Sequence, residues 1–150
     1  MNLRFVPFVA AGCIALAAFA AQAQSAAATP AADPLYADLG GQPGLVSLMD
    51  DFVPRLAGDA RIGAQFRETN LRELKKQLVD QFCVVSGGPC VYEGATMKKA
   101  HADLRIDKAD FNRLVELLQD SMDARGIAFT DQNRLLARLA PMHRDVITTR

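Results

Sequence analysis

The sequence predicts an all-α protein, and three observations lead to this fold class. After residue 34, apolar side chains recur every three or four positions through long stretches, which is the period of an amphipathic helix. No segment of useful length alternates apolar and polar residues as a half-buried strand would. Glycine and proline separate the helical stretches, and no internal repeat is present. We expect one domain of five or six helices, with the four longest stacked in two pairs.

The composition of the 150 residues excludes some classes of function. The formal net charge is zero, so nothing favours binding to a polyanion or to an acidic membrane surface. Tryptophan is absent and aromatic residues make up only 7%, which argues against a stacking platform for single-stranded nucleic acid. We therefore expect no nucleic-acid partner.

Residues 1–23 have the features of a secretory signal peptide. Arg4 supplies the positive start, residues 5–21 are an apolar run, and Ala21-Gln22-Ala23 is a small-residue cleavage site. We expect cleavage after Ala23, export to the periplasm and no stable membrane anchor after processing. Residues 24–33, rich in alanine, then form a flexible lead-in.

Two other interpretations of the N-terminal segment fit the sequence less well. A membrane anchor is disfavoured because the apolar run has 17 residues and contains Pro7 and Gly12, whereas about 20 residues are needed to span a bilayer. A lipoprotein signal ending at Cys13 is disfavoured because the apolar stretch continues beyond that cysteine.

The folded part is predicted to begin with a short helical turn at residues 34–39, ended by Gly40-Gly41. A long helix then starts at residues 42–44, with Pro43 in its opening turn, where a missing N–H is harmless. Pro54 should kink or locally break this helix. Its apolar face consists of Leu45, Leu48, Met49, Phe52, Val53 and Leu56.

The next long helix follows an irregular segment at residues 59–66. Asn70 and Glu73 form a plausible capping box at its start, and Gly87-Gly88 ends it, because glycine readily takes the left-handed C-terminal conformation. One stripe of the helix is apolar and contains Leu71, Leu74, Leu78, Phe82 and Val85.

A rigid turn and a short helix follow. Pro89 has no N–H to donate and pushes the preceding glycine out of the helical region, so the backbone must turn here. Thr96 can cap a new helix whose one side carries Met97, His101 and Leu104. Taken alone, an imidazole on an apolar face is more often a hydrogen-bonded structural residue than a ligand.

Two further long helices complete the chain. The first starts at Asp107, with Asp103 as a less favoured start, and ends near Gly126; its apolar face holds Phe111, Leu114, Val115, Leu118 and Met122. Thr130 is expected to cap the second. Pro141 should interrupt that helix, whose apolar positions are Leu135, Leu139, Met142 and Val146.

Several of these motifs together resemble the truncated haemoglobins, most closely their first group. The resemblance covers roughly residues 35–148. It is carried by Leu35-Tyr36, Leu39-Gly40-Gly41, the segment GGPCVYEG at residues 87–94, MKKAH at residues 97–101, Ile106 and Asp110-Phe111. It implies a two-over-two helical sandwich over residues 34–150 that holds haem and reversibly binds a diatomic ligand, such as oxygen or nitric oxide. Secondary nitric-oxide dioxygenase or peroxidase-like activity is left open.

The resemblance also implies a set of site residues. His101 is the expected iron ligand, and His143 is expected to be exposed. Phe66 takes the place of the ring that wedges against haem, Leu74 and Leu78 lie on the distal helix, and Met97, Ile106 and Phe111 line the proximal side. The expected cofactor-binding set is completed by Phe52, Val53 and Phe82. Without the resemblance, these apolar residues would simply be core.

The sequence departs from the family at the distal wall. First-group members usually carry tyrosine at the position of Val53 and often glutamine at the position of Leu78, as hydrogen-bond donors to bound oxygen. Gln77 and Gln81 are adjacent candidates for the missing donor. The departure predicts weak retention of oxygen unless one of these amides turns inward.

Cys83 and Cys90 are the two cysteines that remain after signal removal. In an oxidising compartment they are either a disulfide or two packed thiols. A zinc site built from both cysteines, His101 and His143 is disfavoured because no Cys-x-x-Cys unit is present.

The alternative function for the protein is a non-haem exported helical domain that binds a partner. In that case the apolar helix faces form only the core.

Overall fold

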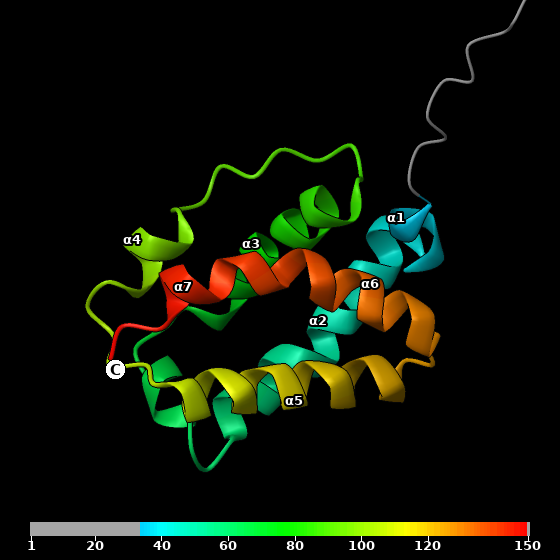
Figure 1. Ribbon diagram of the computed structural model, residues 1–150. Helices are drawn as coiled ribbons and strands as arrows, with labels where there is room; N and C mark the ends of the chain where they lie inside the picture. Colours follow the sequence, from blue (N-terminus) through cyan, green and yellow to red (C-terminus); the bar gives the residue numbers. More distant parts are fainter. Residues whose placement is uncertain (1–33, 150) are drawn as a thin grey trace, which may run out of the picture.

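The computed structural model describes residues 34–149 (Figure 1), so the predicted signal peptide and lead-in lie outside the described residues. Within this range the chain forms seven α-helices, two short 3-10 helices and no strand, which confirms the all-α prediction. The elements in order are α1 (Leu35–Asp38), α2 (Gly41–Gly58), η1 (Gly63–Phe66), α3 (Leu71–Ser86), α4 (Met97–His101), α5 (Lys108–Ala124), α6 (Phe129–Leu139), η2 (Ala140–Met142) and α7 (His143–Val146).

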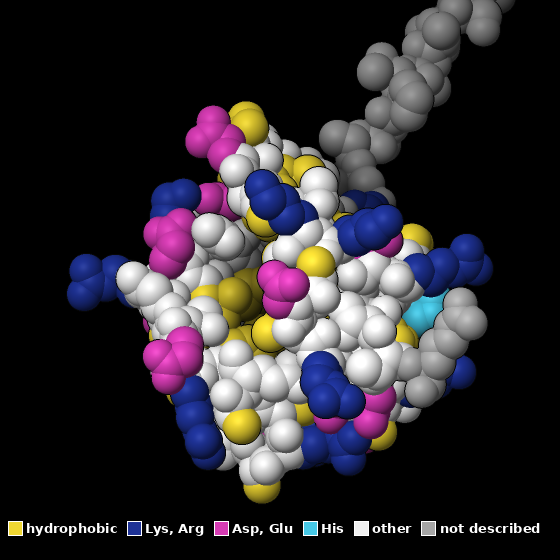
Figure 2. All heavy atoms as spheres, turned by 90° about the vertical axis from the view of Figure 1, so that its left-hand side faces the viewer, with side chains coloured by type: hydrophobic (Ala, Val, Ile, Leu, Met, Phe, Trp, Pro, Cys, Tyr) yellow, Lys and Arg dark blue, Asp and Glu magenta, His cyan; other side chains and the backbone are white. Residues whose placement is uncertain are grey.

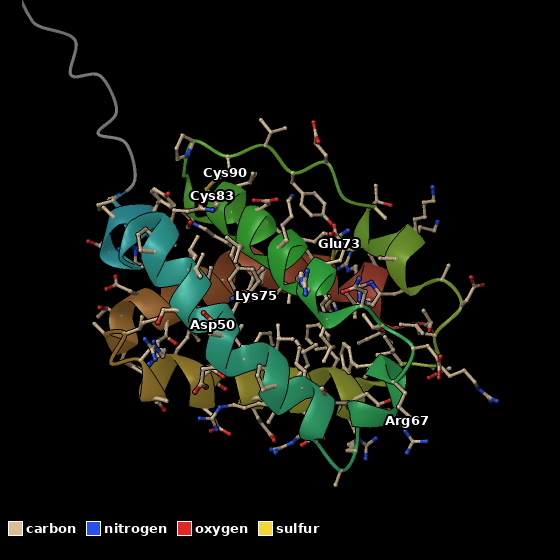
Figure 3. All side chains as sticks on the ribbon, turned by 180° about the vertical axis from the view of Figure 1, so that it is seen from behind. Asp50, Arg67, Glu73, Lys75, Cys83 and Cys90 are labelled. Atoms are coloured by element: carbon tan, nitrogen blue, oxygen red, sulfur yellow. A yellow bond between two sulfur atoms is a disulfide. The ribbon has the colours of Figure 1, made fainter. Side chains whose placement is uncertain are left out.

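The four longest helices form two layers. In Figure 1, α2 and α3 lie behind, and α5 and α6 lie in front of them. The long helix α2 packs against both α3 and α5, and α6 packs against α3. Lys75 of α3 forms an ion pair with Asp50 of α2 on the outer surface of the back layer (Figure 3). The arrangement is the expected two-over-two sandwich.

The core lies between these layers, and α2 contributes most to it. Fully or almost fully buried side chains come from all four long helices. Burial of each such aliphatic side chain stabilises the fold by about 1.5–3 kcal/mol relative to exposure. The core residues on the long helices are Leu45, Leu48, Met49, Phe52, Leu56, Val79, Phe82, Leu117, Leu118, Met122 and Leu135.

Local capping explains where three helices begin or end. The Asn70 side chain accepts hydrogen bonds from the backbone N–H groups of Arg72 (3.1 Å) and Glu73 (3.2 Å), so this half of the predicted box is present. Asp107 and Asp110 form a reciprocal capping box at the start of α5. Gly87, with φ +87°, takes the left-handed position that ends α3, as predicted.

Two sequence predictions about helices need correction. The break that was one of the two options at Pro54 does not occur, because the helix α2 runs unbroken from Gly41 to Gly58 with Pro54 inside it. Pro54 and Asp50, whose carbonyl loses its helical partner, are both exposed, so water can satisfy that carbonyl. Thr130 does not cap α6 but lies within it; Ala128 is the N-cap residue, and its carbonyl accepts from Asp131 (2.9 Å) and Gln132 (3.0 Å).

The end of α3 is tied to the following segment by a disulfide between Cys83 and Cys90 (Figure 3), with Cα atoms 5.9 Å apart. This decides between the two options that the sequence left open. It also removes the thiolates that the zinc alternative required, and no group of His, Cys, Asp and Glu between residues 34 and 149 is placed to hold a metal ion. None of the helices in this part of the chain has the length and apolar character needed to cross a membrane.

Candidate functional site

His101 is the last residue of α4, and one of its ring nitrogens is held by the backbone. Nδ1 lies 2.7 Å from the carbonyl oxygen of Met97, one helical turn earlier. A carbonyl only accepts hydrogen bonds, so Nδ1 carries the hydrogen and donates it. In the neutral ring this leaves the lone pair on Nε2, which is the arrangement found in metal-ligating histidines. The partly buried imidazole is therefore prepared to ligate a metal through Nε2.

The turn before α4 fixes where that helix begins. The Thr96 hydroxyl accepts from the N–H of Lys99 (3.3 Å), which confirms the predicted cap. The Tyr92 hydroxyl donates to the carbonyl of Ala95 (2.8 Å), and burial raises the pKa of this phenol. Gly94 lies against the Tyr92 ring, where an added Cβ would come within 2.4 Å of ring atoms. A side chain at residue 94 would thus displace the tyrosine.

A hollow with a largely hydrophobic lining opens on the side of the molecule that carries α4 and the start of α5 (Figure 2). Among the predicted cofactor residues, five are only half-buried although they are apolar, whereas Phe52, Val53, Phe82 and Ile106 are buried. An apolar cofactor would cover the exposed surface of such large apolar side chains. The five half-buried residues are Phe66, Leu74, Leu78, Met97 and Phe111.

Two of the predicted site residues belong to the central core. Phe52 and Phe82 are 2% and 4% exposed and lie within the main cluster of buried residues. Phe66 and Leu78 pack against that cluster from the outside. The predicted set therefore contains both buried core residues and half-buried residues that pack around the core, and the sequence pattern does not distinguish the two kinds.

Both glutamines that are candidates for a distal donor have side-chain partners. The Gln77 amide donates to the Glu73 carboxylate one turn earlier on α3 (3.1 Å). Gln81 is 8% exposed, and its Nε2 contacts the sulfur atoms of Met97 (3.3 Å) and Met142 (3.6 Å). Thioether sulfur is a weak acceptor. Val53, Leu74 and Leu78, the residues expected at the distal side, have aliphatic side chains that cannot donate a hydrogen bond.

The sequence did not predict that residues near the C-terminal end contact two of the expected site residues, Phe111 and Ile106. The ring of exposed His143 lies edge-on to Phe111, with centroids 6.1 Å apart. Thr148 hydrogen-bonds to Ile106 on the α4–α5 connection. The apolar spacing of Met142 and Val146 indicated that this end packs inward, but no local signal identified its partners.

Charged residues beside the start of α5 fix the neighbouring turn. The carboxylate of half-buried Asp59 accepts from the N–H groups of Ile62 (3.1 Å) and Arg61 (2.9 Å). It also pairs with Nε of Arg113 on α5 (2.9 Å). The hydrogen bond from Ile62, followed by the contact with Arg113, lowers the pKa of Asp59. This carboxylate thereby joins the end of α2 to α5.

The comparisons with known proteins agree with this fold. Residues 34–148 match the model of the family described as bacterial-like globin. A group 1 truncated haemoglobin from a Nostoc species is 30% identical over 72% of this chain and 92% of its own length. One from Mycolicibacterium paratuberculosis is 29% identical over 76% of this chain and 84% of its own.

Solved structures show the same fold. The truncated haemoglobin of Tetrahymena pyriformis in its Fe(III) form aligns with a TM-score of 0.73 at 23% identity, over 75% of this chain and 97% of its own. A 2/2 haemoglobin of a Synechococcus species, in the cyanomet state and with covalently attached heme, aligns with a TM-score of 0.71 at 21% identity, over the same 75% and 97%. Because the family match extends over residues 34–148 and group 1 truncated haemoglobins are among the relatives, the chain belongs to the bacterial-like globin family.

Proposed function

We propose that the protein holds haem through His101 and reversibly binds a diatomic gas at the distal side. Membership of the truncated globin family implies haem-based gas binding. The observation that carries the finer proposal is the hydrogen bond from His101 Nδ1 to the Met97 carbonyl, which leaves Nε2 available. When bound, haem would supply an iron that His101 could ligate and that could bind the gas.

The residues present fit this cofactor. Haem is a broad, apolar ring with one metal, so it needs one nitrogen ligand and an apolar cleft. His101 provides the nitrogen, and its helix lies on the side of the molecule where the hydrophobic hollow opens (Figure 2). The half-buried Phe66, Leu74 and Phe111 supply apolar surface that haem would remove from water.

The distal wall favours ligands that need no hydrogen bond. Val53, Leu74 and Leu78 have aliphatic side chains that donate no hydrogen bond, while the Gln77 amide donates to Glu73. A donor beside a partly negative ligand contributes roughly 1.5–3 kcal/mol. Oxygen depends on such a donor much more than carbon monoxide does. We infer that the protein retains oxygen weakly, while nitric oxide and carbon monoxide are less affected.

The test is an absorption spectrum of the purified full chain after addition of haem, taken with and without reductant and then with carbon monoxide. A haem protein gives one intense band that shifts on reduction and again on addition of carbon monoxide. The alternative, a non-haem domain that binds a partner, gives only the spectrum of free haem, and that result would contradict the proposal.

A further inference from the structure

The helix that carries His101 has little packing of its own. Helix α4 has five residues, Met97–His101, and none of them is buried. It is followed by residues 102–107, which have no helical hydrogen-bond ladder and lead into α5. A short, exposed helix gains little from burial. Its position therefore depends on its contact with α7, on the contact of Met97 with Gln81 and on the segments attached to its two ends.

At the C-terminal end of α4, residues 147–149 lie alongside the α4–α5 connection, and we call these three residues the C-terminal strap. In Figure 1 the red end of the chain runs beside that connection. The N–H groups of Thr148 and Thr149 both donate to the carbonyl of Ile106, each at 3.0 Å. Val146 and Ile106, next to these bonds, are 8% and 6% exposed. The strap is thus fastened to the connection by backbone bonds and by burial.

The hydroxyl of Thr148 makes two further bonds to the same connection. Its Oγ1 accepts from the N–H of Ile106 (2.9 Å) and donates to the carbonyl of Leu104. The N–H of Leu104 in turn donates to the carbonyl of His101 (3.0 Å). One side chain near the end of the chain is therefore joined, through a single intervening residue, to the backbone of His101.

We infer that Thr148 is a positioning residue for His101. Its hydroxyl fixes the Leu104 carbonyl and the Ile106 amide, and so holds the turn that follows α4 in one arrangement. The direction of the imidazole depends in part on that turn because His101 is the last residue of α4 and none of the five residues of this helix is fully buried. The inference rests on the proposed function, since the role of this geometry is to present Nε2 of His101 to haem.

Thr148→Val removes the hydroxyl and keeps the side-chain shape. Thr149→Val is the matched control, because the bond from Thr149 to the Ile106 carbonyl is made by its backbone N–H. Thr148→Ser restores the hydroxyl without the methyl group. The variants are compared as full chains loaded with haem. The measurements are the rate of haem transfer to an excess of haem-free myoglobin and the iron–histidine stretching band of the reduced protein.

Thr148→Val removes both hydrogen bonds of the hydroxyl, so we expect it to lose haem at least about three- to tenfold faster, which is the range for loss of a single hydrogen bond. Its iron–histidine band should shift or broaden. Thr148→Ser should return both properties to those of the wild type, and Thr149→Val should not change them. Wild-type haem loss and an unchanged band in Thr148→Val would overturn the inference, as would equal effects of the two valine variants.

A second measurement on the haem-free chain separates this inference from the proposed function. Hydrogen exchange at the Ile106 amide, which donates to Thr148 Oγ1, should be faster in Thr148→Val than in Thr149→Val. Equal exchange in the two variants would overturn the positioning role, whatever the protein binds. If Ile106 exchange is faster in Thr148→Val but the chain takes up no haem, the bond between the C-terminal strap and the connection is supported. The proposed function is then refuted.

Discussion

Val53 is buried in α2, 4% exposed, with an isopropyl side chain at the position where first-group truncated haemoglobins usually carry tyrosine. The two candidate donors to a bound ligand already have partners within the protein. Gln77 binds Glu73, and Gln81 contacts two methionine sulfur atoms. At the scale of single residues, the proposed ligand preference thus depends on side chains that donate no hydrogen bond.

Val53→Tyr should slow oxygen release by at least about tenfold, because a new donor beside a partly negative ligand contributes roughly 1.5–3 kcal/mol. Carbon monoxide release should barely change. Val53→Phe is the matched control, since it adds the ring without the hydroxyl. Stopped-flow release rates measure both gases. Slow oxygen release from the wild type would contradict the apolar wall; Gln77→Leu or Gln81→Leu would then show which amide turns inward.

At the scale of elements, local chemistry determines most helix ends. The caps at Asn70 and Thr96, the helix start at Asp107 and the glycine at residue 87 could all be predicted, because each depends on residues within one turn. The start of α6 could not be predicted in this way. Its cap at Ala128 uses no side chain, so the hydroxyl of Thr130 was misleading.

The disulfide between Cys83 and Cys90 should stabilise the end of α3 and the turn beyond it. For a loop of about eight residues, the chain-entropy estimate is about 2–3 kcal/mol. Cys90→Ala should lower the free energy of unfolding in urea by about that amount, and reduction of the wild type should have a similar effect. Mass spectrometry of the untreated chain should find it two protons lighter than the reduced form. Free thiols on both residues would contradict the bridge.

Asp59 should make the turn between α2 and η1 sensitive to acid. Hydrogen bonds from Ile62 and Arg113 lower the pKa of its carboxyl in the folded state below the ordinary value of 3.8. The stabilisation is therefore complete above that ordinary value and is lost as the pH falls through the folded pKa. Asp59→Ala should lower the midpoint of thermal unfolding at pH 7. The midpoint of this variant should also fall less than that of the wild type as the pH is lowered. Parallel pH profiles of wild type and Asp59→Ala would rule this out.

At the scale of the whole molecule, the order of the helices and their two layers followed from apolar periodicity, since each long stripe needs a partner. Contacts between distant segments could not be predicted from local patterns. Gln81 meets Met142, 61 positions later, and Ile106 meets Thr148, 42 positions later. Both contacts form only when the C-terminal end packs beside α4, and no spacing rule identifies them.

Export is proposed for the whole chain, and the disulfide supports an oxidising compartment. The features of residues 1–23 predict that the mature protein starts at Gln24. N-terminal sequencing of protein recovered from the periplasmic fraction should find that residue. Recovery of the chain with Met1 still attached, in a membrane pellet, would refute the proposal.

The central claim is that His101 holds the haem iron. The chain has two histidines, so His143→Ala is a natural control for His101→Ala. The measurement is the haem content of the wild type and of both variants, purified in parallel after loading and washing. Our account predicts that His101→Ala loses most of its haem, whereas His143→Ala keeps the content and the spectrum of the wild type. Equal haem content in His101→Ala and the wild type would contradict it.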